Sequence, residues 1–138
     1  MKILNVKQIR DTDAFTIKNE PIESSDLMER AANAFAIWFA TKFAKPAQIA
    51  IFCGLGNNGG DGLALARLLS LRHFSVAVYI VRFSSKYSAD FAINERRLQR
   101  FKDISVKNIH SANDFPIFSP KTIFIDALLL PWLIKFCF

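Results

Sequence analysis

The stretch Cys53-Gly54-Leu55-Gly56-Asn57-Asn58-Gly59-Gly60-Asp61-Gly62 holds all five glycines of this 138-residue chain. It follows Ile49–Cys53, a short apolar run that is typical of a strand buried on both faces. Leu63–Arg72, after it, has the apolar spacing of a helix, which we expect to begin near Asp61. In such a turn, backbone N–H groups can approach a ligand without obstruction, and the helix dipole favours negative charge there. The stretch therefore predicts a phosphate-binding site.

The stretch differs from the common phosphate-binding motifs. It lacks the Gly-Lys-Ser/Thr ending of a P-loop, and its glycines do not have the usual dinucleotide-binding spacing. Asn57, Asn58 and Asp61 instead supply amide and carboxylate oxygens, which suit a hard cation. The alternative is a purely structural turn, which the concentration of all glycines within nine residues disfavours.

Helices and strands are expected to alternate outward from this stretch. Alternation of this kind predicts one α/β domain with a mostly parallel sheet, in a Rossmann-like three-layer α/β/α arrangement with two N-terminal helices. In the second of these helices, one broad face suits packing against the sheet; it consists of Leu27, Ala31, Ala34, Phe35, Trp38 and Phe39. The aromatic stripe of Phe35, Trp38, Phe39 and Phe43 is expected to belong to the core, with a subunit interface as the alternative. The expected helices span residues 6–18, 24–43, 63–72 and 88–101, and the expected strands span 49–53, 76–81, 104–109 and 122–126.

Composition limits the compartment and the partners. The net charge of +6 and the pI near 9.6 are compatible with anionic partners, but the charges form no long basic run, so we expect no nucleic acid. No apolar run reaches the roughly 18 residues of a membrane span, and the start of the chain lacks a signal-peptide core. Cys53 and Cys137 form no metal or disulfide pattern, which fits a reducing cytoplasm. Cys53 is expected to be a buried packing residue; a thiol with a lowered pKa at the helix start is the alternative.

The glycine stretch closely resembles the Gly-x-Gly-Asn-Asn-Gly-Gly-Asp-Gly loop of the YjeF N-terminal domain family, the NAD(P)H-hydrate epimerases. The resemblance covers roughly residues 1–128, and the nine-residue loop is its specific part. Supporting matches, in the family's order, are Arg10 and Asp13, Leu27–Ala32 (with Ala32 where the family has Gly), Ala64–Leu68, Asn94 and Ile125–Leu128.

The resemblance implies an isomerase that interconverts the R and S forms of hydrated NADH and NADPH. It implies that Asn57, Asn58, Gly59, Gly60 and Asp61 bind this small-molecule substrate. It further implies a potassium ion held by Asn58 and Asp126. A homodimer and a dehydratase partner, fused or separate, are part of the same expectation.

The sequence departs from the family just after Ala127 or Leu128. Residues 129–138 form an apolar tail that supplies no glycine for the substrate loop expected there. We therefore expect a single partial domain that ends prematurely, is weakly active or inactive, and leaves a sheet edge unpaired. A natural short variant whose tail packs as a helix or strand is the alternative. The acidic residue expected to move the proton lies beyond the chain, so no catalytic residue is assigned.

A second class of function stays open, a non-catalytic nucleotide- or protein-binding module on the same scaffold. The intact Asn57–Asp61 run favours a site that served catalysis, whereas the departure after Ala127 favours the binding module. A generic Rossmann dehydrogenase fits poorly, because Val76–Val81 is followed by Arg82 and not by an acidic residue that reads a ribose.

Overall fold

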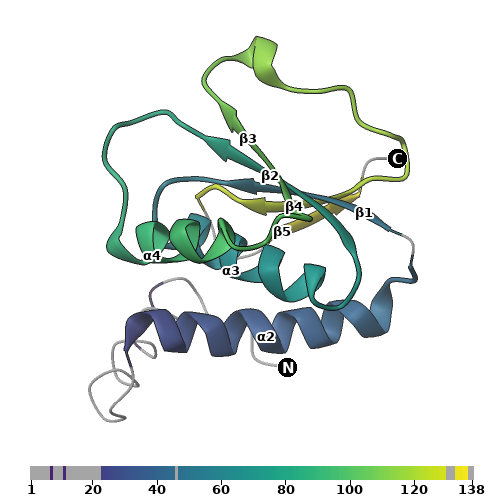
Figure 1. Ribbon diagram of the computed structural model, residues 1–138, viewed down its shortest axis with the longest axis horizontal. Helices are drawn as coiled ribbons and strands as arrows, with labels where there is room; N and C mark the ends of the chain where they lie inside the picture. Colours follow the sequence, from purple (N-terminus) through teal and green to yellow (C-terminus); the bar gives the residue numbers. More distant parts are fainter. Residues whose placement is uncertain (1–6, 8–10, 12–22, 46, 130–132, 137–138) are drawn as a thin grey trace.

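The computed structural model describes residues 7, 11, 23–45, 47–129 and 133–136, and within them helices lie beside one five-stranded sheet (Figure 1). Helices and strands alternate along most of the chain, as expected. The first of the two expected N-terminal helices falls mainly outside the described residues. The elements are α2 (Ser24–Lys42), β1 (Gln48–Cys53), α3 (Asn57–Ser70), β2 (Ser75–Val81), α4 (Ala89–Leu98), β3 (Ser105–Ile109), η1 (Ala112–Asp114), β4 (Ile123–Ala127) and β5 (Leu133–Phe136).

The sheet has the strand order β3-β2-β1-β4-β5, which places β1 at its centre. β1 pairs in parallel with β2 and β4, and β2 pairs in parallel with β3. Ile51 of β1 lies in register with Val78 on one side and Ile125 on the other. The continuous apolar runs of these strands are therefore explained by burial within the sheet, and the mostly parallel sheet is confirmed.

β5 is the one antiparallel strand in the described part of the sheet. It runs along β4 with Asp126 opposite Leu133 and Ile123 opposite Phe136. Part of the apolar tail thus supplies backbone partners to β4, so the outer strand on this side of the described sheet is β5 and not β4. Residues 130–132 and 137–138 of the tail lie outside the described residues.

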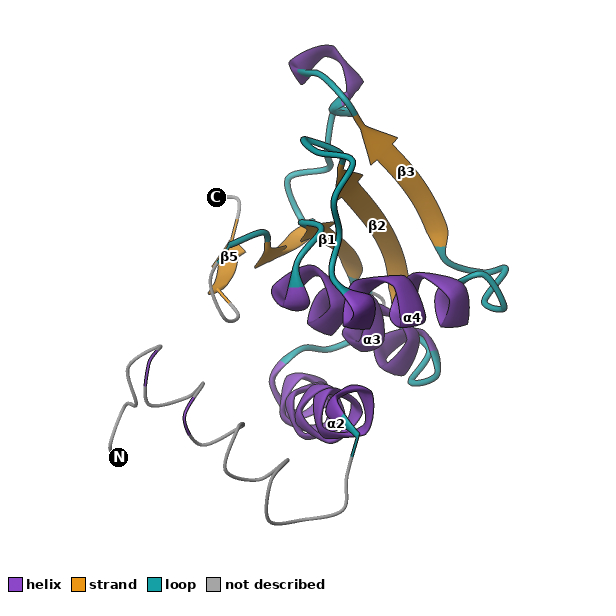
Figure 2. Cartoon of the chain, turned by 90° about the vertical axis from the view of Figure 1, so that its left-hand side faces the viewer, coloured by secondary structure: helices purple, strands orange, loops and turns teal. Residues whose placement is uncertain are grey.

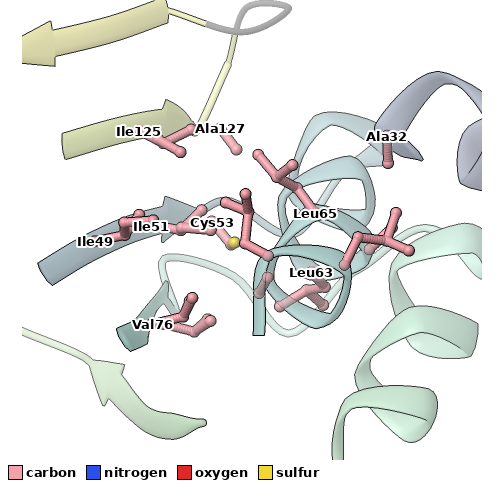
Figure 3. Close-up of a cluster of buried hydrophobic side chains, with 14 of the residues drawn as sticks. Ala32, Ile49, Ile51, Cys53, Leu63, Leu65, Val76, Ile125 and Ala127 are labelled. Carbon is pink, nitrogen blue, oxygen red and sulfur yellow. The ribbon is translucent and has the colours of Figure 1, made fainter. Parts of the chain in front are cut away.

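Helix α3 lies at the centre of the hydrophobic core. It packs on β1, β2 and β4 with one side and on α2 and α4 with the other. Figure 3 shows Leu63 and Leu65 of α3 among side chains of the strands, including Ile51, Cys53 and Ile125. All of these side chains are at most 2% exposed, so the core is continuous from the sheet into the helix.

Helix α2 lies on α3 and α4, not on the sheet (Figure 2). The expected packing of this helix on the sheet is therefore wrong. The expectation that the aromatic stripe belongs to the core is confirmed for Phe39, which is fully buried, and for Phe35 and Phe43, which pack against the core. The buried face of α2 consists of Met28, Ala32, Ala36 and Phe39, whereas Trp38 remains 44% exposed. Small alanines at this spacing let two helices approach closely.

The described helices gather on one side of the sheet (Figure 2). The opposite face carries aromatic side chains, with Phe52 stacked on Tyr79 and on Phe124. Phe118, from the segment before β4, covers this row by edge-on contacts with all three rings. The α/β Rossmann-like class is confirmed; the second helical layer of the α/β/α arrangement is not among the described residues.

Candidate functional site

The predicted binding residues lie in the first two turns of α3 and not in a loop. The helix begins at Asn57, so the expected start near Asp61 is wrong. Its N-cap is Gly56, which has no side chain to accept hydrogen bonds from the first backbone N–H groups. Gly60 N–H already donates to the Gly56 carbonyl at 3.1 Å. The predicted anion-binding groups are therefore backbone N–H groups of the helix terminus itself.

Three glycines allow α3 to approach the ends of the strands. A Cβ on Gly59 would lie 1.9 Å from the Gly54 carbonyl oxygen, and one on Gly54 would lie 2.5 Å from the Leu128 carbonyl oxygen. A Cβ on Gly62 would lie 2.7 Å from Cys53 Sγ and from the Ala127 Cβ. No described glycine has a positive φ, so close packing, not turn geometry, requires glycine here.

The other two glycines of the stretch face different surroundings. Gly60 faces α2 and α4, where a Cβ would lie 3.2 Å from both Met28 Sδ and Phe91 N. Gly56 faces open space, because nothing lies within 4 Å of the position of its Cβ. Gly56 and Asn57 are exposed, and Asn58 and Asp61 are half-buried. The accessible part of the stretch is therefore the start of α3.

The two predicted potassium ligands lie on segments that meet at Gly54. Asn58 directly precedes Gly59, which contacts Gly54, and Gly54 N–H donates to the carbonyl of Ala127 at 3.1 Å. Asp126 directly precedes Ala127, and its Oδ1 accepts a hydrogen bond from Leu128 N at 3.0 Å. Both residues thus lie near the carboxyl ends of β1 and β4, at the edge where ligands bind in open α/β sheets.

The connection between β2 and α4 forms a further side of this edge. Ser88 N–H donates to the Leu55 carbonyl at 2.9 Å, which ties the connection to the glycine stretch. The Ser88 hydroxyl oxygen accepts from Phe91 N at 3.1 Å and so caps α4. Unlike α3, α4 therefore has its own side-chain cap.

Cys53, at the end of β1, is fully buried beside α3 (Figure 3). Burial raises the pKa of the Cys53 thiol. The expectation of a buried packing residue is confirmed, and the alternative of a thiol with a lowered pKa is wrong. Helix α3 starts only after Gly54, Leu55 and Gly56, and the effect of burial on the thiolate outweighs the helix dipole.

A polar cluster behind the site was not predicted. Arg67 of α3 is 7% exposed and makes a two-bond contact with the Glu29 carboxylate of α2, at 3.2 and 2.7 Å. It also donates to Asn94 Oδ1 of α4 at 2.8 Å. The signal in the sequence was an arginine within the apolar run Leu63–Leu69, seven residues after Gly60 and so on the same helix face.

The comparisons with known proteins agree with this geometry. The family described as "YjeF-related protein N-terminus" matches residues 24–131. The NAD(P)H-hydrate epimerase of Oenococcus oeni is 31% identical over 126 residues, which cover 91% of this chain and 57% of the relative. That of Rhodobacter capsulatus is 33% identical over 134 residues, covering 92% and 61%.

A solved structure has the same fold. The crystal structure of yeast ynu0 superposes with a TM-score of 0.77 at 24% sequence identity and covers 94% of this chain and 57% of the yeast chain. The chain thus spans a little over half the length of these relatives. In the part of the chain that the structure describes, no helix is long and apolar enough to cross a membrane. Nor do three or more His, Cys, Asp or Glu residues gather there in a group that could hold a metal ion.

Proposed function

The chain belongs to the YjeF-related protein N-terminus family, and from this premise we propose that it acts as an NAD(P)H-hydrate epimerase. The reaction interconverts the R and S forms of hydrated NADH and NADPH. The observation that carries the proposal is the uncapped start of α3 at the carboxyl edge of β1 and β4, within a domain of this family. No catalytic residue is assigned.

The proposed substrate contacts come from Asn57, Asn58, Gly59, Gly60 and Asp61. The first backbone N–H groups of α3 would bind a phosphate of the dinucleotide, because a glycine N-cap leaves them without a side-chain acceptor. The exposed Asn57 and the half-buried Asp61 would bind polar groups of the substrate. The buried Gly59 and Gly60 contribute by allowing the turn to lie close to its neighbours.

A potassium ion is part of the proposal, with Asn58 and Asp126 as its ligands. The donor set suits a hard cation, because it would consist of amide and carboxylate oxygens. Support comes from the segments that carry Asn58 and Asp126, which meet at Gly54. The bound ion would supply positive charge beside the phosphate-binding turn. The side chains of Asn58 and Asp126 would fix its position there.

The test is an epimerase assay coupled to a dehydratase that consumes only the S form. Purified chain is added to R-hydrated NADPH in potassium buffer, and regeneration of NADPH is compared with the spontaneous rate. We expect acceleration by the wild type and its loss in Asp61→Ala. Asp103→Ala is the matched control. Asp103 is exposed and lies just before β3, so it is at the amino ends of the parallel strands, away from the carboxyl ends that carry the proposed site.

A second measurement separates catalysis from binding. Thermal stabilisation by NADP⁺ with potassium that disappears in Asp61→Ala, without any acceleration of epimerisation, would favour the non-catalytic nucleotide-binding module. Neither stabilisation nor acceleration by a folded wild-type chain would contradict the proposed site altogether.

The cellular setting follows from the same proposal. We place the protein in the cytoplasm, in keeping with its free cysteine at position 53, with a dehydratase as the enzyme that consumes the S form. A homodimer is proposed as its oligomeric state. Sedimentation of the purified chain tests the last point.

A further inference from the structure

The polar cluster of Glu29, Arg67 and Asn94 connects three helices behind the proposed site. Arg67 of α3 contacts the carboxylate of Glu29 on α2 through both terminal nitrogens, and Nη2 also donates to Asn94 of α4. Asn94 is fully buried, and its Nδ2 donates to the Asp90 carbonyl at 3.0 Å and lies 3.2 Å from Met28 Sδ. The cluster therefore fixes α2 and α4 relative to α3.

The same neighbours contact the substrate-binding turn. Met28 Sδ and the backbone of Asp90 and Phe91 are the atoms that a Cβ on Gly60 would meet, at 3.2 to 3.3 Å. Gly60 and Arg67 are seven residues apart, so they lie two turns apart on one face of α3. The cluster at Arg67 thus holds in place the two segments that press on Gly60.

The opposite side of this turn rests on backbone. Gly59 lies against the Gly54 carbonyl, which leaves no space for movement towards the sheet. Gly59 and Gly60 are therefore enclosed between the Gly54 turn on one side and α2 with α4 on the other, whereas Asn57 stays exposed. The position of the turn on the second side depends on whether α2 and α4 remain docked.

Stability alone is a poor account of the cluster. Nε of Arg67 is buried and has no hydrogen-bond partner within the described residues. A buried ion pair with an unsatisfied donor adds little net stability compared with apolar packing. A two-bond arginine–carboxylate contact instead fixes the packed helices in one relative position.

We propose that Arg67 is a positioning residue for the substrate-binding turn, acting through Met28 and Asp90 on Gly60. The inference rests on the proposed function and extends it to a residue behind the site. Loss of the cluster would loosen the first turns of α3 and misplace the groups that bind phosphate.

The test compares Arg67→Gln with Arg72→Gln, using the full chain. Arg72 is the matched control, because it also joins α2 to α3, through Asn33 Oδ1 at 2.9 Å, but beyond the far end of α3. Hydrogen exchange at the amides of residues 60–64 is measured without ligand. We expect it to be at least about tenfold faster in Arg67→Gln than in Arg72→Gln, because local opening depends on local contacts.

The affinity of the same variants for NADP⁺ tests whether the position of the turn matters for binding. We expect Arg67→Gln to weaken binding by about tenfold to 100-fold, because misplaced N–H groups would lose a hydrogen bond to a charged phosphate. Arg72→Gln should change it by less than about twofold, and Arg67→Lys should recover part of the loss. If Arg67→Gln does not fold, hydrogen exchange and NADP⁺ affinity are compared between Arg67→Lys and Arg72→Lys instead.

The possible failures are distinct. Equal exchange at residues 60–64 in the two variants would overturn the positioning role, whatever NADP⁺ does. Faster exchange in Arg67→Gln would support positioning of the turn. If NADP⁺ affinity is at the same time unchanged in both Arg67→Gln and Asp61→Ala, the proposed substrate site is overturned.

Discussion

Gly59, in the first turn of α3, lies directly against the carbonyl oxygen of Gly54, which is only 1.9 Å from the position of a Cβ on Gly59. The contact joins the proposed substrate-binding turn, residues 57–61, to the end of the central strand through backbone atoms. Both Gly54 and Gly59 contribute backbone atoms to this contact, and backbone atoms cannot move aside as the end of a flexible side chain can. The spacing therefore restricts which residues this turn accepts.

Gly59→Ala should destabilise the protein, although alanine is the better helix former. The clash with the Gly54 carbonyl outweighs the propensity gain, and we expect a loss of about 2 to 5 kcal/mol in the free energy of unfolding. Gly56→Ala is the control, because nothing lies within 4 Å of its Cβ position and its φ is −90°. It should stay within about 1 kcal/mol of the wild type in urea denaturation. Equal effects of the two substitutions would contradict the packing argument.

Asn94→Ala should destabilise the protein by about 2 to 4 kcal/mol, since it removes a buried partner of Arg67 and leaves a small cavity. Asn108→Ala provides the comparison, because Asn108 is exposed and accepts one hydrogen bond, from Arg82 Nε at 2.8 Å. Its cost should be below about 1 kcal/mol. Urea midpoints of the two variants measure the difference, and similar midpoints would show that the Asn94 cluster contributes no more than a surface contact.

Cys53 should resist thiol reagents in the folded protein. Burial excludes the reagent and raises the pKa of the thiol, so little thiolate forms near neutral pH. The measurement is the rate of labelling of Cys53 in a Cys137→Ser background, with and without urea. Labelling of the folded protein as fast as in urea would show that the end of β1 is accessible.

Asp114 should make stability depend on pH in the acid range. Its carboxylate accepts hydrogen bonds from His110 N at 2.8 Å and Ser111 N at 2.9 Å, and these bonds lower its pKa below 3.8. A lowered pKa in the folded state adds stability above the unfolded-state pKa, and that stability is lost as the pH falls through the folded-state value. Asp114→Asn should therefore lower the urea midpoint at neutral pH but have a smaller effect at about pH 2 to 3.

Asp103→Asn is the control for this comparison, since Asp103 is also exposed in a turn beside β3. Its effect on the urea midpoint should be small at both pH values. A pH-independent loss in Asp114→Asn would show that the side chain acts through shape and not through charge.

The order of strands and helices could be predicted because each signal is local. Ile49–Cys53 is apolar throughout, and it forms the central strand with partners on both sides. The start of α3 could not be predicted, because asparagine and glycine favour turns in isolation. These residues are helical in the fold because of tertiary packing. Gly59 contacts Gly54 across the turn, and Gly60 contacts α2 and α4, which are distant in the sequence.

The buried face of α2 was mispredicted for a related reason. Alanines and large apolar residues occur on several sides of this helix, so periodicity alone did not select Met28, Ala32 and Ala36 over Ala31 and Trp38. The partner decided the face, because α2 packs on α3 and α4. The glycine stretch marked the place of the candidate site, but the support from Arg67 depends on three helices meeting and is not visible in any one segment.

The enclosure of α3 has a thermodynamic consequence for binding. A loop that closed around a phosphate would lose conformational freedom at that moment, at about 1 to 2 kcal/mol for each residue fixed. Here the amide groups already point outward from a helix that the core holds rigid. That entropic cost is met when the chain folds, so a dinucleotide would meet a preorganised surface and retain more of its interaction energy as affinity.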